Sequence, residues 1–159
     1  MNTTISFKTT LQTPSWPKAI LAGIPATVME TIMMYKGAPM MIGQPMDIAL
    51  ELSKMMDVSW TVGMLMHILL GIVIFPLAYV SVARQWLPGP NVVRGIVWGL
   101  VLWVIAMFVM SPMMGKGLLM GGIPQGVAAL VAHVAYGAIL GAIAGSAKLF
   151  LGRGRLKFY

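Results

Sequence analysis

Four long apolar stretches, separated by short polar segments, make up most of this chain of 159 residues. Each is close to the roughly 20 residues that a helix needs to cross the hydrocarbon core of a bilayer. Only 9% of the residues are charged, whereas a soluble domain carries about 25%. The sequence therefore predicts an all-α membrane protein with four transmembrane helices, over residues 19–35, 59–82, 92–110 and 124–151.

The second half of the chain repeats landmarks of the first half at a nearly constant offset. Gly23 aligns with Gly95, Pro39-Met40-Met41 with Pro112-Met113-Met114, and His67-x-x-x-Gly71 with His133-x-x-x-Gly137. Internal repeats of this size are common in membrane bundles. We predict a tandem repeat, over residues 19–82 and 92–151, in which an apolar helix, a Pro-Met-Met loop and a histidine-bearing helix follow one another.

The basic residues indicate how the chain is oriented. With four spans, both termini and the middle loop lie on one side of the membrane. That side holds eight of the eleven basic residues: Lys8, Lys18, Arg84, Arg94, Lys148, Arg153, Arg155 and Lys157. The positive-inside rule then predicts an inner (plasma) membrane protein with a cytoplasmic segment 1–18 and a basic cytoplasmic tail 152–159. We interpret the net charge of +7 as an orientation signal that touches anionic lipid, and expect no nucleic-acid partner.

The first outer segment differs from the second. Residues 47–57 alternate apolar and charged side chains at helical spacing, which predicts a short amphipathic helix in the outer interface. Trp60 then opens the second span at headgroup depth. The second outer loop, residues 113–125, is rich in glycine and proline and shows no such pattern.

Small residues recur every four positions along the predicted spans. Such stripes let helix backbones approach closely in lipid. The predicted packing glycines are Gly23, Gly63, Gly71, Gly95, Gly99, Gly137, Gly141 and Gly145. Both histidines fall within these stripes, so we expect them to face protein.

His67, His133 and Glu30 are ionisable residues at similar depths in the outer half of the spans. An ionisable group in hydrocarbon is costly unless it is paired or functional. One hypothesis is a haem b with His67 and His133 as axial ligands. A metal site built from all three side chains is another. The alternative is structural: each histidine bonds a backbone carbonyl or Glu30.

The methionines form the second anomaly. There are sixteen, and all except Met1 lie within residues 29–66 or 107–120, on the outer side of the predicted bundle. Thioethers are soft ligands for Cu(I), which nominates Met40, Met41, Met113 and Met114 as a copper site. Methionine also suits adaptable packing and docking surfaces, and we favour this interpretation.

No catalytic motif is evident. The chain has no cysteine, which excludes disulfides and thiolate chemistry. It also lacks a Walker loop, an HExxH motif and a Ser–His–Asp order. We therefore expect a protein that is not itself an enzyme, although it can belong to an enzyme complex.

Several local motifs resemble a family of uncharacterised bacterial and archaeal four-helix membrane proteins, known as a domain of unknown function. They span about residues 21–145: Ala22-Gly23-Ile-Pro-Ala-Thr27, Pro45-Met-Asp47-Ile-Ala49, His67-x-x-x-Gly71, Leu87-Pro-Gly-Pro, Arg94-Gly95 and His133-x-x-Tyr136-Gly137. The resemblance implies an integral membrane protein without assigned chemistry, whose relatives occur with respiratory oxidase components. Glu30 has no counterpart in the resemblance.

The sequence favours a non-catalytic accessory subunit of a larger inner-membrane respiratory or copper-containing oxidase complex. Its expected partners are other integral membrane subunits and lipids. Two alternatives stay open: a small bis-histidine haem b electron carrier, and a membrane protein that handles copper or a small solute.

Overall fold

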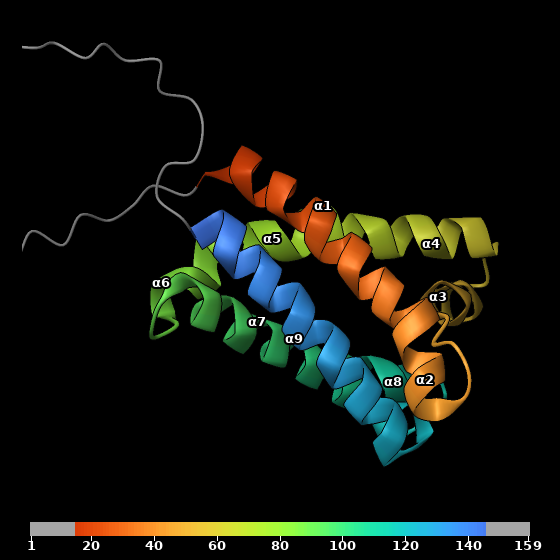
Figure 1. The fold of residues 1–159 in the computed structure, drawn as a ribbon. Coiled ribbons are helices and arrows are strands. Elements are labelled where there is room, and N and C mark those ends of the chain that lie inside the picture. The colour runs from red at the N-terminus through yellow and green to blue at the C-terminus, as the bar shows by residue number, and fades with distance from the viewer. Residues whose placement is uncertain (1–14, 146–159) are drawn as a thin grey trace, which may run out of the picture.

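The computed structural model describes residues 15–145, which form helices and short connections without any strand (Figure 1). The first helical rod comprises α1 (Trp16–Ile32), the π-helical segment η1 (Met33–Gly37) and α2 (Ala38–Ile42). A short helix, α3 (Ile48–Met56), follows where the amphipathic outer helix was predicted. The predicted segment 1–18 and tail 152–159 lie almost entirely outside the described residues.

The second rod runs through α4 (Trp60–Leu69), η2 (Leu70–Ile74), α5 (Phe75–Ala78), η3 (Tyr79–Ala83) and α6 (Arg84–Trp86). The third comprises α7 (Asn91–Ile105), η4 (Ala106–Met110) and α8 (Ser111–Met113). A 3₁₀ turn, η5 (Leu118–Gly121), leads into α9 (Ile123–Gly145).

Within residues 15–145, three helices are long and apolar enough to cross a membrane: Trp60–Trp86, Asn91–Met113 and Ile123–Gly145. They contain the third predicted span, the described part of the fourth, and the second except for its first residue, Ser59. The first predicted span, residues 19–35, is helical but is not among the three. Its helix is more polar because it includes Pro25, Thr27, Glu30 and Thr31.

Helix α9 is the central element of the bundle. It packs along α7 and also against α1, while α1 packs on η2 and α5 of the second rod. Helix α4 packs mainly on the short helix α3. As a result, the ribbons of α4 and α7 diverge from the turn that joins their two rods (Figure 1).

Glycines allow the tightest helix contacts. A Cβ added to Gly137 would collide with the backbone carbonyl of Gly95, and one added to Gly95 would collide with the carbonyl of Gly137. Gly71 lies against Thr27, and Gly63 lies against the backbone of α3. All eight glycines of the predicted stripes are buried against another helix: Gly23, Gly63, Gly71, Gly95, Gly99, Gly137, Gly141 and Gly145.

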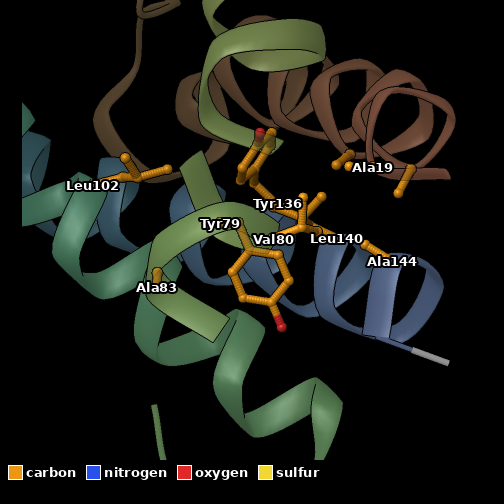
Figure 2. Close-up of a cluster of buried hydrophobic side chains, with 10 residues drawn as sticks. Ala19, Tyr79, Val80, Ala83, Leu102, Tyr136, Leu140 and Ala144 are labelled. Atoms are coloured by element: carbon orange, nitrogen blue, oxygen red, sulfur yellow. The ribbon is translucent and has the colours of Figure 1, made fainter. Parts of the chain in front are cut away.

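A core of buried hydrophobic side chains lies between α1, α9 and the second rod, around two aromatic side chains. Tyr79 and Tyr136 are almost completely buried, with Leu140 between neighbouring helices (Figure 2). Small side chains of α1 and α9 complete the cluster: Ala19, Ala22, Ala26 and Ala144. This core fixes α1, α9 and the second rod relative to one another.

The prediction of Pro-Met-Met loops was wrong. Pro39 lies inside α2 and Pro112 inside α8, so both helices continue past the expected ends. Each proline comes two residues after a π-helical segment, and Pro76 follows η2 in the same way. A proline in a helix removes one N–H donor and crowds the preceding turn. The wider π turn accommodates it without ending the helix.

Candidate functional site

A cavity of about 140 Å³ lies where α4 and α7 diverge, and it is lined by residues of the three rods, of α9 and of the segment around α3. Residues of α1 and α9 line it, together with residues of η2 and η4. Nearly all of its lining is apolar. The exceptions are the three ionisable residues singled out in the sequence: Glu30, His67 and His133.

Glu30 and His133 face each other across the contact between α1 and α9. Glu30 Oε1 lies 3.8 Å from His133 Nδ1, and the side chains are only 9% and 13% exposed. The same Nδ1 is 2.9 Å from the carbonyl oxygen of Ala129. A carbonyl only accepts, so Nδ1–H donates to it. Neutral His133 therefore keeps an unprotonated Nε2, and Glu30 has no hydrogen-bond partner among residues 15–145.

His67 is held by the hydroxyl group of Thr31 on α1. The Thr31 hydroxyl donates to the Thr27 carbonyl at 2.8 Å, so its single hydrogen is used. His67 Nε2 lies 3.2 Å from the hydroxyl oxygen of Thr31 and must be the donor in this hydrogen bond. Neutral His67 is thus protonated at Nε2, and its Nδ1 retains a free lone pair.

Six methionines line the cavity with these groups: Met34, Met46, Met107, Met110, Met114 and Met120. Two of them are held in place by backbone hydrogen bonds across the structure. Met46 N–H donates to the Met34 carbonyl at 3.0 Å. Met120 N–H donates to the Ser111 hydroxyl at 2.9 Å. Met120 also has a positive φ of 58°, which is rare for a bulky residue.

The methionines nominated from the sequence are placed differently. Met114 lines the cavity, but Met40, Met41 and Met113 do not. Their side chains are exposed, Met40 by 89% and Met113 by 64%. Sequence reasoning missed most of the cavity methionines, because their spacing alone does not tell which side of a helix faces inward.

The cavity is small as it stands in this structure. Pockets that hold cofactor-sized ligands have volumes of roughly 300–1,000 Å³, and this one has about 140 Å³. A hard-metal site is also poorly supported. Within the described part of the chain, no three histidine or acidic side chains are close enough to hold one ion. The arrangement instead offers two imidazole lone pairs, one buried carboxylate and several thioethers.

Asp47, between the cavity-lining residues Met46 and Ile48, joins three segments beside the cavity, a role that sequence reasoning missed. Its carboxylate caps α3 by accepting from the Leu50 N–H at 2.9 Å. It also accepts from the Tyr35 hydroxyl at 2.7 Å and from the Trp60 indole at 3.1 Å. Burial raises the pKa of Asp47, but these hydrogen bonds outweigh it and hold the pKa below its ordinary value of 3.8. The signal in the sequence is an N-cap residue directly before a helical pattern.

Comparison with known proteins gives one match. A family model described as a family of unknown function (DUF6789) matches residues 15–148. No curated protein matches the chain. No solved structure matches it either.

Proposed function

Because the chain belongs to this family of unknown function, we propose from its site that it is a non-catalytic accessory subunit of a larger inner-membrane complex. The complex is a respiratory or copper-containing oxidase, and both termini are cytoplasmic. The second and third rods carry the contact with the core subunit.

The observation that carries this proposal is the divergence of α4 from α7. It leaves the second and third rods with large uncovered apolar surfaces. In the most apolar 18-residue stretch of each helix, the buried share is 28% for the second rod and 22% for the third, against 44% for α9. Ile105, on the wall of the cavity, is itself 45% exposed. A transmembrane helix of a partner subunit would cover this surface.

We further propose that the first rod also spans the membrane and that the bundle is a tandem repeat. The face of α1 away from the bundle is apolar, with Leu21, Val28 and Ile32 exposed. The π-helical segments η1 and η4 fall at corresponding places in the two halves, each followed by Xaa-Pro. The contact of Thr27 with Gly71 has its counterpart in the contact of Gly99 with Gly137.

Site-specific photo-crosslinking in native membranes tests the accessory role. A photoreactive residue at Ile105 is expected to form an adduct with an integral subunit that carries haem or copper. The same residue at Leu21, which is also exposed but lies on α1 and does not line the cavity, serves as the control. Oxidase subunits should co-migrate with the full chain after mild solubilisation. Isolation of a lone chain, with lipid adducts alone at both positions, would refute the proposal.

A further inference from the structure

We infer that the cavity binds a single Cu(I) ion, held by His67, His133 and thioethers of the lining methionines. The chemistry of the donors carries this inference. Thioether sulfur and imidazole nitrogen are ligands that favour Cu(I), whereas harder cations need several oxygen ligands. Six methionines and both described histidines share one cavity of about 140 Å³.

The hydrogen bonding of the two imidazoles matches that of metal ligands. A histidine that ligates a metal almost always donates its other ring N–H to a carbonyl, carboxylate or similar acceptor. His133 donates from Nδ1 to the Ala129 carbonyl at 2.9 Å. His67 donates from Nε2 to the Thr31 hydroxyl at 3.2 Å. In both residues the second nitrogen is left with a free lone pair and without a partner among residues 15–145.

Glu30 supplies the charge that a cation needs in this setting. Its side chain is 9% exposed and lines the cavity without any hydrogen-bond partner among the described residues. A carboxylate at this depth is costly unless its charge is balanced. One monovalent cation held nearby by neutral ligands would balance it. A divalent ion would leave an excess positive charge.

The expected ligands differ from the exposed methionines that the sequence nominated. Met34 and Met107 are buried at 8% and 3% exposure and line the cavity. Met40 and Met113 are exposed and do not. This difference provides a matched pair of variants with the same chemical change. Copper binding by the isolated chain needs no partner subunit. A chain that binds no copper can therefore still be an accessory subunit, and a chain without a partner subunit can still bind copper.

The test is anaerobic titration of the purified full chain with Cu(I) in competition with a colorimetric chelator. Wild type is expected to bind one equivalent, and X-ray absorption should show both sulfur and nitrogen ligands. The double variant His67→Gln/His133→Gln should lose this binding. Thr31→Val removes the acceptor for His67, together with the hydroxyl's own bond to the Thr27 carbonyl, and should weaken binding about tenfold.

Two further comparisons keep the outcome decisive if the histidine variants fold poorly. Met34→Leu/Met107→Leu should weaken Cu(I) binding at least about tenfold, whereas Met40→Leu/Met113→Leu should leave it unchanged. Ag(I) should compete for the site and Zn(II) should not. Absence of stoichiometric Cu(I) binding, equal binding of Zn(II), or loss of binding only in the Met40/Met113 variant would overturn the inference.

Discussion

The hydroxyl of Tyr136 donates a 2.7 Å hydrogen bond to the backbone carbonyl of Gly71. In the π-helical segment η2, the Phe75 N–H bonds the Leu70 carbonyl, so it is not available to Gly71. The next residue, Pro76, has no N–H at all. The side chain of α9 therefore supplies the donor that the second rod lacks. The Met34 carbonyl in η1 is in the same position, because the Ala38 N–H bonds the Met33 carbonyl and the next residue is Pro39. The Met46 N–H donates to it instead.

Replacing Tyr136 with phenylalanine should destabilise the bundle, because it leaves the Gly71 carbonyl buried without a donor. Hydrogen bonds between membrane helices contribute about 0.6 kcal/mol on average and up to about 1.7 kcal/mol. We expect a loss in the upper part of this range, measured as the free energy of unfolding in mixed micelles. Tyr79→Phe is the control, because Tyr79 is equally buried but its hydroxyl contacts the Asn91 carbonyl at a longer 3.4 Å. Equal losses in the two variants would contradict this assignment.

Gly137→Ala should be strongly destabilising, because the added methyl group would meet the backbone of Gly95 on α7. Backbone atoms cannot rotate away as a side chain can, so α7 and α9 must separate. Overpacking of this kind costs about 1–3 kcal/mol. Gly37→Ala is the matched control, since its nearest neighbour is the flexible side chain of Met33 at 3.3 Å. In thermal unfolding followed by circular dichroism, the midpoint temperature should be lower than that of wild type for Gly137→Ala only. A midpoint of Gly137→Ala unchanged from wild type would rule out the proposed tight contact.

The helix faces were predictable from sequence because glycine spacing reports packing directly. Gly137, Gly141 and Gly145 recur every four residues and all lie against α7. The same spacing placed His133 on a protein-facing side, and the structure puts it on the cavity wall. In lipid, close approach of two helices requires small residues, so glycines at this spacing mark the face that contacts a neighbouring helix.

The course of the rods past their prolines was not predictable. A proline can end a helix or be absorbed by a π turn, and at Pro39 and Pro76 the rod continues with a distant group bonded to the freed carbonyl. Tyr136 and Met46 supply such donors from elsewhere in the chain. The junction at Asp47 escaped prediction for the same reason, since its donors Tyr35 and Trp60 come from two other helices.

The hydrogen bonds to Asp47 predict a specific loss of stability in acid. The pKa of Asp47 in the folded chain lies below its ordinary value of 3.8, so ionisation favours folding. This contribution is fully present above the ordinary value and is lost as the pH falls through the lower folded value. Asp47→Asn keeps an acceptor for the α3 cap but carries no charge. The melting temperature of wild type should exceed that of Asp47→Asn at neutral pH, and the difference should vanish in acid. A difference independent of pH would show that the charge is irrelevant.

Glu51 joins α3 to the loop between α8 and η5 through Lys116. Its Oε1 lies 3.1 Å from the Lys116 ammonium nitrogen and 3.8 Å from that of Lys54. The Glu51 side chain is 11% exposed, while the two lysines are 39% and 60% exposed. Partly exposed pairs contribute about 0.2–1 kcal/mol and weaken with salt. A double-mutant cycle of Glu51→Gln with Lys116→Met should therefore give a coupling energy in this range that falls as salt is added. The parallel cycle with Lys54→Met should give less, because its nitrogen is more distant and more hydrated. If the Lys54 coupling were the larger, Glu51 would pair mainly within α3, and the link from α3 to the loop at Lys116 would be absent.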